Sequence, residues 1–240
     1  TVRLIAHTPE PEKVVAAAAK LCYSDAHITD LLDGLTEEKT AKFLTMLSDL
    51  GHASPIEHAS FTFLIEGVSR VLLAQLTRHR IASFSVQSQR YVSYAGGFGY
   101  IVPPAIRALG SGAEEEYHRQ MAQIQAWYEG WQKRLGDAGE KSNEDARFVL
   151  PGACETRVLL TMNARELMHF FSLRCCNRAQ WEIREMAWQM LALCKQAAPA
   201  LFEHAGPACV SGACPEGSMS CGRAAEMRKK YAFLKGDEMV

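Results

Sequence analysis

The sequence has no large excess of charge of either sign. Among its 240 residues, 26 are Lys or Arg and 27 are Asp or Glu, which gives a formal net charge of −1 at pH 7. Domains that bind nucleic acid in general usually carry a clear basic excess. We therefore do not expect a general nucleic-acid-binding protein, and we expect the positive charge to be concentrated at a local site for a small anionic ligand.

Long hydrophobic runs and a leader are also missing. No run of about 18 apolar residues is present to cross a bilayer, and the first residues lack the basic, apolar and small-residue order of a signal peptide. The eight cysteines are irregularly placed, which is typical of reduced thiols and not of a disulfide framework. These absences predict a cytoplasmic protein with no membrane segment.

The hydrophobic pattern predicts few strands and many helices. A hydrophobic content of 48% and a charged content of 22% are ordinary for a globular protein of this length. Alternation predicts strands over residues 2–7, 61–65 and 154–162, and helical spacing predicts helices over residues 10–22, 36–50, 69–78, 113–135 and 181–198. We expect an α+β fold, with helices packed on a small, mostly antiparallel sheet.

The most informative stretch is RHRIASFSVQSQRY, residues 78–91. Two arginines flank His79, Ser88 and Arg90 follow, and almost no acidic residue lies nearby in the sequence to neutralise them. The planar Arg fork matches phosphate oxygens, and a hydroxyl with neighbouring backbone N–H groups can complete a phosphate cradle. Because such a cluster is costly without an anion, it predicts a nucleotide site. A solvated basic turn is the alternative interpretation.

An R-H-R motif followed by seven residues and a serine resembles the signature of the flavin-dependent thymidylate synthases. A second match, RCCNRAQWEIR at residues 174–184, follows in the correct order. The resemblance reaches about residue 205. It implies reductive methylation of dUMP to dTMP, with 5,10-methylenetetrahydrofolate as one-carbon donor and FAD, reduced by NADPH, as hydride carrier. It further implies a synthase domain over residues 1–205 and a homotetramer with shared active sites. The Cys-rich tail with a terminal helix, residues 206–240, is either part of the same domain or a flap.

The same resemblance assigns residues to two ligands. The predicted dUMP contacts are Gln75, Arg78, Ser88, Gln89, Arg90, Arg147 and Arg174. The predicted FAD contacts are His52, Ser54, Arg78, His79, Arg80, Asn163, Arg165 and His169. Arg165 and His169 are four residues apart on a predicted helix, so they share a face. A G-x-G-x-x-G motif after a strand is missing, so the FAD site is not expected to be of the Rossmann type.

Arg174 is the predicted catalytic residue. The resemblance implies that it stabilises the uracil ring as its N3-deprotonated anion, since a permanent cation beside N3 and its carbonyl lowers the cost of that charge. The alternative is a cation that only complements the dipole at the end of its helix. Many members of the family carry an acidic residue where this chain has Val86, which puts any carboxylate contact there in doubt.

The cysteines offer two further alternatives. Cys154, or the pair next to Arg174, is a candidate nucleophile because a neighbouring Arg lowers a thiol pKa, but buried thiol is the commoner role. The tail thiols are candidates for zinc or an iron–sulfur cluster, although their spacing is not that of common zinc sites, and no metal is predicted. Those thiols, with their candidate fourth ligands, are Cys209, Cys214, Cys221, His204 and Cys194.

Two other classes of function stay open at this point. One is an RNA- or nucleotide-binding regulator that uses the arginine cluster without catalysis. The other is a metal-dependent interaction module built on the tail cysteines.

Overall fold

The computed structural model describes residues 1–234 and forms two compact units. Unit 1 contains residues 1–64, 79–84 and the chain from residue 159 onward, and unit 2 contains residues 65–78 and 85–158. Each unit is therefore assembled from segments that are distant in the sequence.

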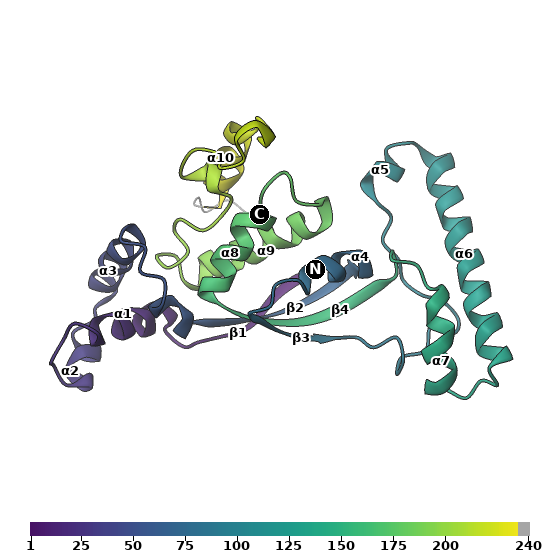
Figure 1. Cartoon of the computed structure of the whole chain (residues 1–240), viewed down its shortest axis with the longest axis horizontal. Coiled ribbons are helices and arrows are strands. Elements are labelled where there is room, and N and C mark those ends of the chain that lie inside the picture. Colours follow the sequence, from purple (N-terminus) through teal and green to yellow (C-terminus); the bar gives the residue numbers. More distant parts are fainter. Residues whose placement is uncertain (235–240) are drawn as a thin grey trace. The chain divides into compact units, whose positions relative to one another are not determined.

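A four-stranded antiparallel sheet has the strand order β1-β2-β4-β3 (Figure 1). The strands are β1 (Val2–His7), β2 (Ser60–Ser69), β3 (Ala82–Val86) and β4 (Glu155–Asn163). Phe61, Phe63 and Ile65 are fully buried on β2, and every second residue of β4 is buried, as the period of a strand requires. The sequence did not predict β3. Its residues alternate only between half-buried and exposed, so they form no apolar stripe.

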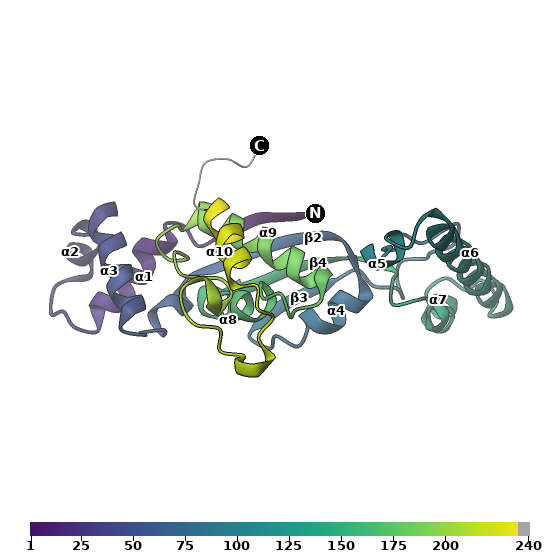
Figure 2. The same cartoon turned by 90° about the horizontal axis from the view of Figure 1, so that it is seen from above.

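Unit 1 holds most of the helices. They are α1 (Pro11–Leu21), α2 (Ile28–Asp33), α3 (Glu37–Asp49), α8 (Ala164–Arg174), α9 (Trp181–Ala197) and α10 (Ala224–Phe233), with 3₁₀ turns η1 (Pro55–His58), η3 (Ala208–Val210) and η4 (Gly217–Met219). α1 contacts α2, α3 and η1, and these helices form one group (Figure 2). α9 packs on β1 and α8. Between these elements Phe171 and Phe61 both contact the Phe202 ring, with centroids 6.2 and 5.2 Å away.

Three side chains begin the helices that position predicted site residues. Thr36 Oγ1 accepts a hydrogen bond from the backbone N–H of residue 39 at the start of α3. Ser69 Oγ does the same for Leu72 at the start of α4 (3.0 Å), and Asn163 Oδ1 for Glu166 at the start of α8 (2.9 Å). These contacts satisfy backbone donors that have no partner inside the helix. The starts of α3 and α4 agree with the helices predicted over residues 36–50 and 69–78.

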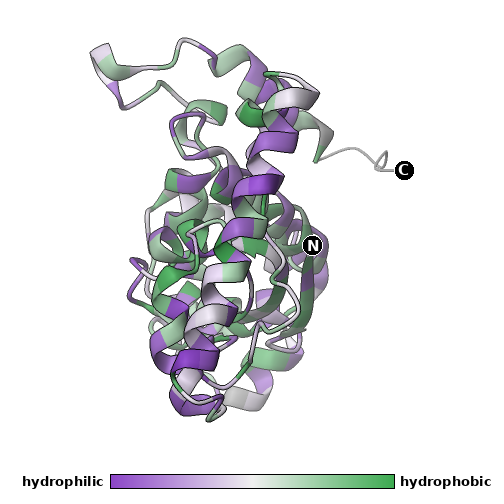
Figure 3. Cartoon of the chain, turned by 90° about the vertical axis from the view of Figure 1, so that its right-hand side faces the viewer, coloured by the Kyte–Doolittle hydropathy of each residue, from purple (hydrophilic) through white to green (hydrophobic). Residues whose placement is uncertain are grey.

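Unit 2 packs around aromatic side chains. Its helices are α4 (Arg70–Leu76), α5 (Pro104–Arg107), α6 (Ser111–Arg134) and α7 (Glu140–Ala146), with the 3₁₀ turn η2 (Arg147–Val149). Tyr94, Phe98, Met121 and Tyr128 form a buried cluster with Cys154. α6 packs on α7, and much of α6 is hydrophilic (purple and pale in Figure 3).

Residues 206–234 belong to unit 1. Arg228 Nε donates to the Cys209 carbonyl (2.9 Å), and Lys195 Nζ donates to the Tyr231 hydroxyl (2.8 Å), so η3 and α9 both contact α10. The end of the predicted tail, residues 235–240, lies outside the described residues, and the boundary at residue 205 stays a prediction. Over residues 1–234, no helix combines the length and the apolar composition that crossing a membrane requires.

Candidate active site

Ser88, Gln89 and Arg90 form an ordered turn just after β3. The Ser88 hydroxyl accepts hydrogen bonds from the backbone N–H groups of Arg90 (3.1 Å) and Tyr91 (3.4 Å), a local pattern that fixes a turn. Gln89 is buried and donates from Nε2 to the sulfur of Cys154 (3.4 Å). Three of the predicted dUMP contacts therefore lie on a segment with a defined conformation.

A buried polar network anchors this turn to α6 and α7. Asn143 donates from Nδ2 to the carbonyl oxygen of Arg90 (3.1 Å). Its Oδ1 atom accepts from Gln132 Nε2 (2.6 Å) and from the Tyr128 hydroxyl (3.3 Å). Satisfied buried networks of this kind rigidify the segments that they join. The network therefore fixes the backbone of the turn through its contact with α7.

Two arginines of the predicted dUMP set meet at Glu144. Arg90 Nη2 lies 2.7 Å from Glu140 Oε1, and Arg90 Nε lies 2.7 Å from Glu144 Oε2. The contact at Nε is an ion pair whose geometry is not that of a hydrogen bond. Arg147 Nε donates to the backbone carbonyl of Glu144 (3.1 Å). The argument that no carboxylate neutralises the arginine cluster was therefore wrong for Arg90. Both of its partners come from α7, which is remote in the sequence.

Gln75 and Arg78 lie on and just after α4. Gln75 is half-buried and Arg78 is exposed. The start of α4 is tied to the segments around the turn, because Arg70 donates from its backbone to the Cys154 carbonyl (3.0 Å) and from Nη1 to the Gln87 carbonyl (3.3 Å). Among the described residues of unit 2, no hydrogen bond or ion pair joins Gln75 or Arg78 to Ser88, Gln89, Arg90 or Arg147.

The predicted FAD contacts of unit 1 gather around η1 and α8, which pack together. His52 and Ser54 are exposed just before η1, and His169 is exposed on α8. Arg165 forms an ion pair with Glu57 of η1, so this cation has a carboxylate partner. Arg80 is also exposed, and within the described residues no carboxylate pairs with it.

His79 lies between the carboxylate of Glu166 and the guanidinium of Arg174 inside unit 1. Its Nδ1 atom is 2.9 Å from Glu166 Oε1, and its Nε2 atom is 3.1 Å from Arg174 Nε. The Phe170 ring packs edge-on at 4.9 Å. Burial lowers the pKa of His79 below its ordinary value of 6.5, and Arg174 adds to that effect against the opposing influence of Glu166.

This arrangement changes the interpretation of His79 as an FAD contact. The residue is only 5% exposed and both nitrogens of its ring are engaged, so the ring has no hydrogen bond left for a flavin. Sequence reasoning missed Glu166 altogether. The available signal was its spacing, since Glu166, Phe170 and Arg174 follow one another at four-residue steps along one helix face.

The cysteines have the properties of structural thiols. Burial raises the pKa of Cys154 and also that of Cys175, so neither favours the thiolate that a nucleophile needs. Within residues 1–234, no three or more His, Cys, Asp or Glu side chains are grouped to hold a metal ion, and the tail cysteines are included in that range.

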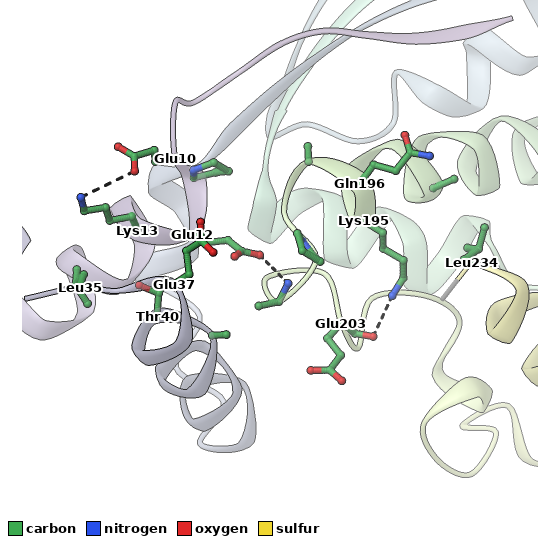
Figure 4. Close-up of a pocket in the computed structure, with 16 residues that line it drawn as sticks. Glu10, Glu12, Lys13, Leu35, Glu37, Thr40, Lys195, Gln196, Glu203 and Leu234 are labelled. Atoms are coloured by element: carbon green, nitrogen blue, oxygen red, sulfur yellow. Dashed lines mark hydrogen bonds and ion pairs between the residues drawn. The ribbon is translucent and has the colours of Figure 1, made fainter. Parts of the chain in front are cut away.

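Unit 1 contains a cleft of about 1150 Å³ lined by residues of α1, α3 and α9 (Figure 4). None of the predicted site residues lines it. Its polar groups already serve the fold. Glu12 accepts hydrogen bonds from the backbone N–H groups of Ala200 (2.6 Å) and Leu201 (3.0 Å), and Lys195 donates to the Glu203 carbonyl (3.1 Å). We therefore assign the chemistry to the residues described above.

Comparison with known proteins identifies the class. Residues 3–200 match the family described as thymidylate synthase complementing protein. The chain is 53% identical to the flavin-dependent thymidylate synthase of Clostridium tetani and 51% identical to that of Geobacter sulfurreducens, with 96% of this chain and at least 96% of each relative covered. It also resembles the crystal structure of the UMP/dUMP methylase PolB from Streptomyces cacaoi bound with 5-Br dUMP, with a TM-score of 0.69 and 29% identity. That match covers 85% of this chain and 93% of the other.

The fold, the arginine-rich turn and these relatives define a nucleotide-methylating enzyme. The chain belongs to the family of flavin-dependent thymidylate synthases. It is an enzyme that methylates dUMP to dTMP, and its cofactor is FAD.

Proposed function

We propose that the Ser88–Arg90 turn and Arg147 bind the phosphate of dUMP, and that Arg174 stabilises the N3 anion of its uracil ring. The observation that carries the first part is the anchoring of the turn by Asn143, which presents a hydroxyl and a guanidinium from a rigid backbone. Arg147, like Arg90, contacts Glu144, but through the backbone carbonyl, and it has no carboxylate partner within residues 1–234. Charged hydrogen bonds contribute about 1.5–3 kcal/mol each, so a few of them suffice for micromolar binding.

The residues around η1 and α8 fit FAD by their chemistry. Arg80 supplies an exposed cation of the kind that a pyrophosphate needs, and His52 and His169 supply imidazoles for the edge or face of a flavin ring. When bound in its reduced form, FAD supplies the hydride for the new methyl group. Methylenetetrahydrofolate as carbon donor, NADPH as reductant and a cytoplasmic location belong to the same proposal.

Arg174 then does one task at the uracil ring. A cation placed before the reaction begins stabilises charge that develops on N3 and its carbonyl without reorganisation of solvent. C5 of the anionic ring is a better nucleophile, so no cysteine has to add at C6. The raised pKa of Cys154 supports this division of roles, because its thiol is disfavoured as a thiolate.

We also propose that the enzyme is a homotetramer whose subunits share active sites. Trp127 and Trp131 lie four residues apart on the otherwise hydrophilic helix α6 and are 55% and 45% exposed, and Phe148 is 82% exposed. Aromatic side chains on a surface are typical of an interface. Light scattering of the FAD-loaded protein tests the proposal, and a monomeric mass would contradict it.

The role of Arg174 is tested by replacing it with Ala. The variant should keep FAD through desalting, as measured by visible absorbance, and lose nearly all dTMP formation. Arg223→Ala is the matched control, because Arg223 is an exposed arginine whose only described ion pair, within residues 1–234, is with Glu226 (2.5 Å). Undiminished activity of Arg174→Ala would contradict its role. A wild-type protein that binds no flavin, and whose spectrum does not change with dUMP, would instead favour a nucleotide-binding regulator.

A further inference from the structure

The contact between His79 and Arg174 determines where the proton of the imidazole lies. A guanidinium can only donate hydrogen bonds. Arg174 Nε therefore donates to His79 Nε2, and this nitrogen must carry a lone pair. The imidazole proton of a neutral His79 then lies on Nδ1, where it donates to Glu166 Oε1 at 2.9 Å. The two distances together specify one tautomer.

The surroundings of His79 favour this neutral state. Its side chain is 4% exposed and that of Glu166 is 9% exposed. The titratable and charged groups that act on His79 are Glu166, Arg174 and His169, all from α8. If His79 took up a second proton, an N–H group would face the N–H group of Arg174, and two cations would lie side by side. The contact at Nε would then be lost.

We propose that Glu166 and His79 are positioning residues that orient the guanidinium of Arg174 through a neutral imidazole. The proposal rests on the role of Arg174 proposed above. A planar guanidinium whose Nε is fixed cannot rotate about the long axis of its side chain, so the direction of its outer N–H groups is set. The direction from which Arg174 meets its substrate then depends on Glu166 and His79.

The first test replaces Glu166 with Gln. The amide can donate as well as accept, so it no longer enforces the proton on Nδ1. We expect bound FAD and the KM for dUMP to stay near wild type, while kcat falls about tenfold to a hundredfold, the cost of a small misplacement. Glu185→Gln is the control, because Glu185 is an exposed carboxylate on α9 that pairs with Lys230 (3.7 Å). Equal kcat values in the two variants would overturn the proposal.

The pH profile of kcat separates positioning from a purely structural role. In the wild type, activity should fall at low pH as His79 takes up a proton. The Glu166→Gln variant lacks the anion that favours the protonated ring, so its acidic limb should shift to lower pH even though its plateau is lower. A loss of stability alone would not move this limb. An unchanged limb therefore counts against the proposal.

A second pair of variants keeps the test decisive if Glu166→Gln fails to fold. In His79→Gln, the side-chain oxygen can take the place of Nε2 as the acceptor for Arg174, whereas His79→Phe keeps a buried ring without an acceptor. We expect a higher kcat for His79→Gln than for His79→Phe. Equal kcat values, or loss of flavin from His79→Gln, would overturn the proposal. If Arg174→Ala itself stays active, the role of Arg174 fails, whatever these variants show.

Discussion

Gln89 donates a hydrogen bond from Nε2 to the sulfur of Cys154, at 3.4 Å, inside unit 2. The bond joins the arginine-rich turn to the start of β4 and gives both buried groups a partner. It also assigns Cys154 a structural role, because a sulfur that accepts a hydrogen bond in a buried site is not placed to attack a substrate.

Cys154→Ser should therefore retain activity. A hydroxyl can accept the same hydrogen bond from Gln89, so we expect kcat for dTMP formation within about threefold of wild type. This change is smaller than the loss of one net hydrogen bond would produce. Cys154→Val is the companion variant. It removes the acceptor and should lower thermal stability more than the serine variant does. Complete inactivity of a folded Cys154→Ser protein would revive a thiolate mechanism.

Arg90→Ala should weaken dUMP binding. Its guanidinium lies beside Glu140 and Glu144, and its removal leaves two carboxylates where a phosphate is expected. Loss of one charged hydrogen bond of about 1.5–3 kcal/mol corresponds to a rise in KM of roughly tenfold to a hundredfold. Arg157→Ala removes an arginine that pairs with Glu66 (3.3 Å) and is the control in the same unit. An unchanged KM in Arg90→Ala would place the phosphate elsewhere.

Asn143→Ala should both destabilise the protein and raise the KM for dUMP. The substitution removes the donor to the Arg90 carbonyl and one acceptor of the buried network, at a cost of about 1–3 kcal/mol for a buried group left unsatisfied. Chemical unfolding measures the first effect and steady-state kinetics the second. Gln120→Ala is the control, since that side chain bonds only to Glu116 on the surface of α6 within the described residues. A destabilised variant with a normal KM would show that the network stabilises the fold without contributing to dUMP binding.

The stability of the wild type should fall as the pH is lowered through the ordinary pKa of histidine. Because the pKa of His79 is below 6.5 in the folded protein, the unfolded chain takes up this proton first, and protonation favours unfolding. The loss of stability begins below about pH 6.5 and is complete once the pH lies below the pKa of His79 in the folded protein. His79→Gln lacks this titration, so its melting temperature should change less between pH 7.5 and 5.5. Parallel curves for the two proteins would contradict the direction of the shift.

Local signals predicted much of this fold. Thr36, Ser69 and Asn163 cap helices because a side-chain oxygen beside an unpaired backbone N–H is a contact within a few residues. β2 and β4 were visible because buried residues alternate along them. β3 was not, since its burial depends on the neighbouring strand and its own pattern is mixed.

The parts of the site that the sequence did not reveal are contacts between distant segments. Glu140 and Glu144 reach Arg90 from α7, and Glu166 contacts Arg174 through His79, which lies 87 residues before Glu166. Nothing in the neighbouring residues of Arg90 or His79 encodes such partners. The family resemblance supplied Arg174, but its contact with His79 is visible only in the structure.

The pairing of Arg90 has a consequence for selectivity. Two arginines, Arg90 and Arg147, and two glutamates, Glu140 and Glu144, lie together in unit 2, so this patch is electroneutral before any ligand arrives. A free phosphate ion or a polyanion such as RNA gains little long-range attraction there and must compete with carboxylates at contact distance. Only an anion with additional contacts, such as a nucleotide whose base is also recognised, displaces them. We therefore expect this patch to bind inorganic phosphate more weakly than it binds a nucleotide.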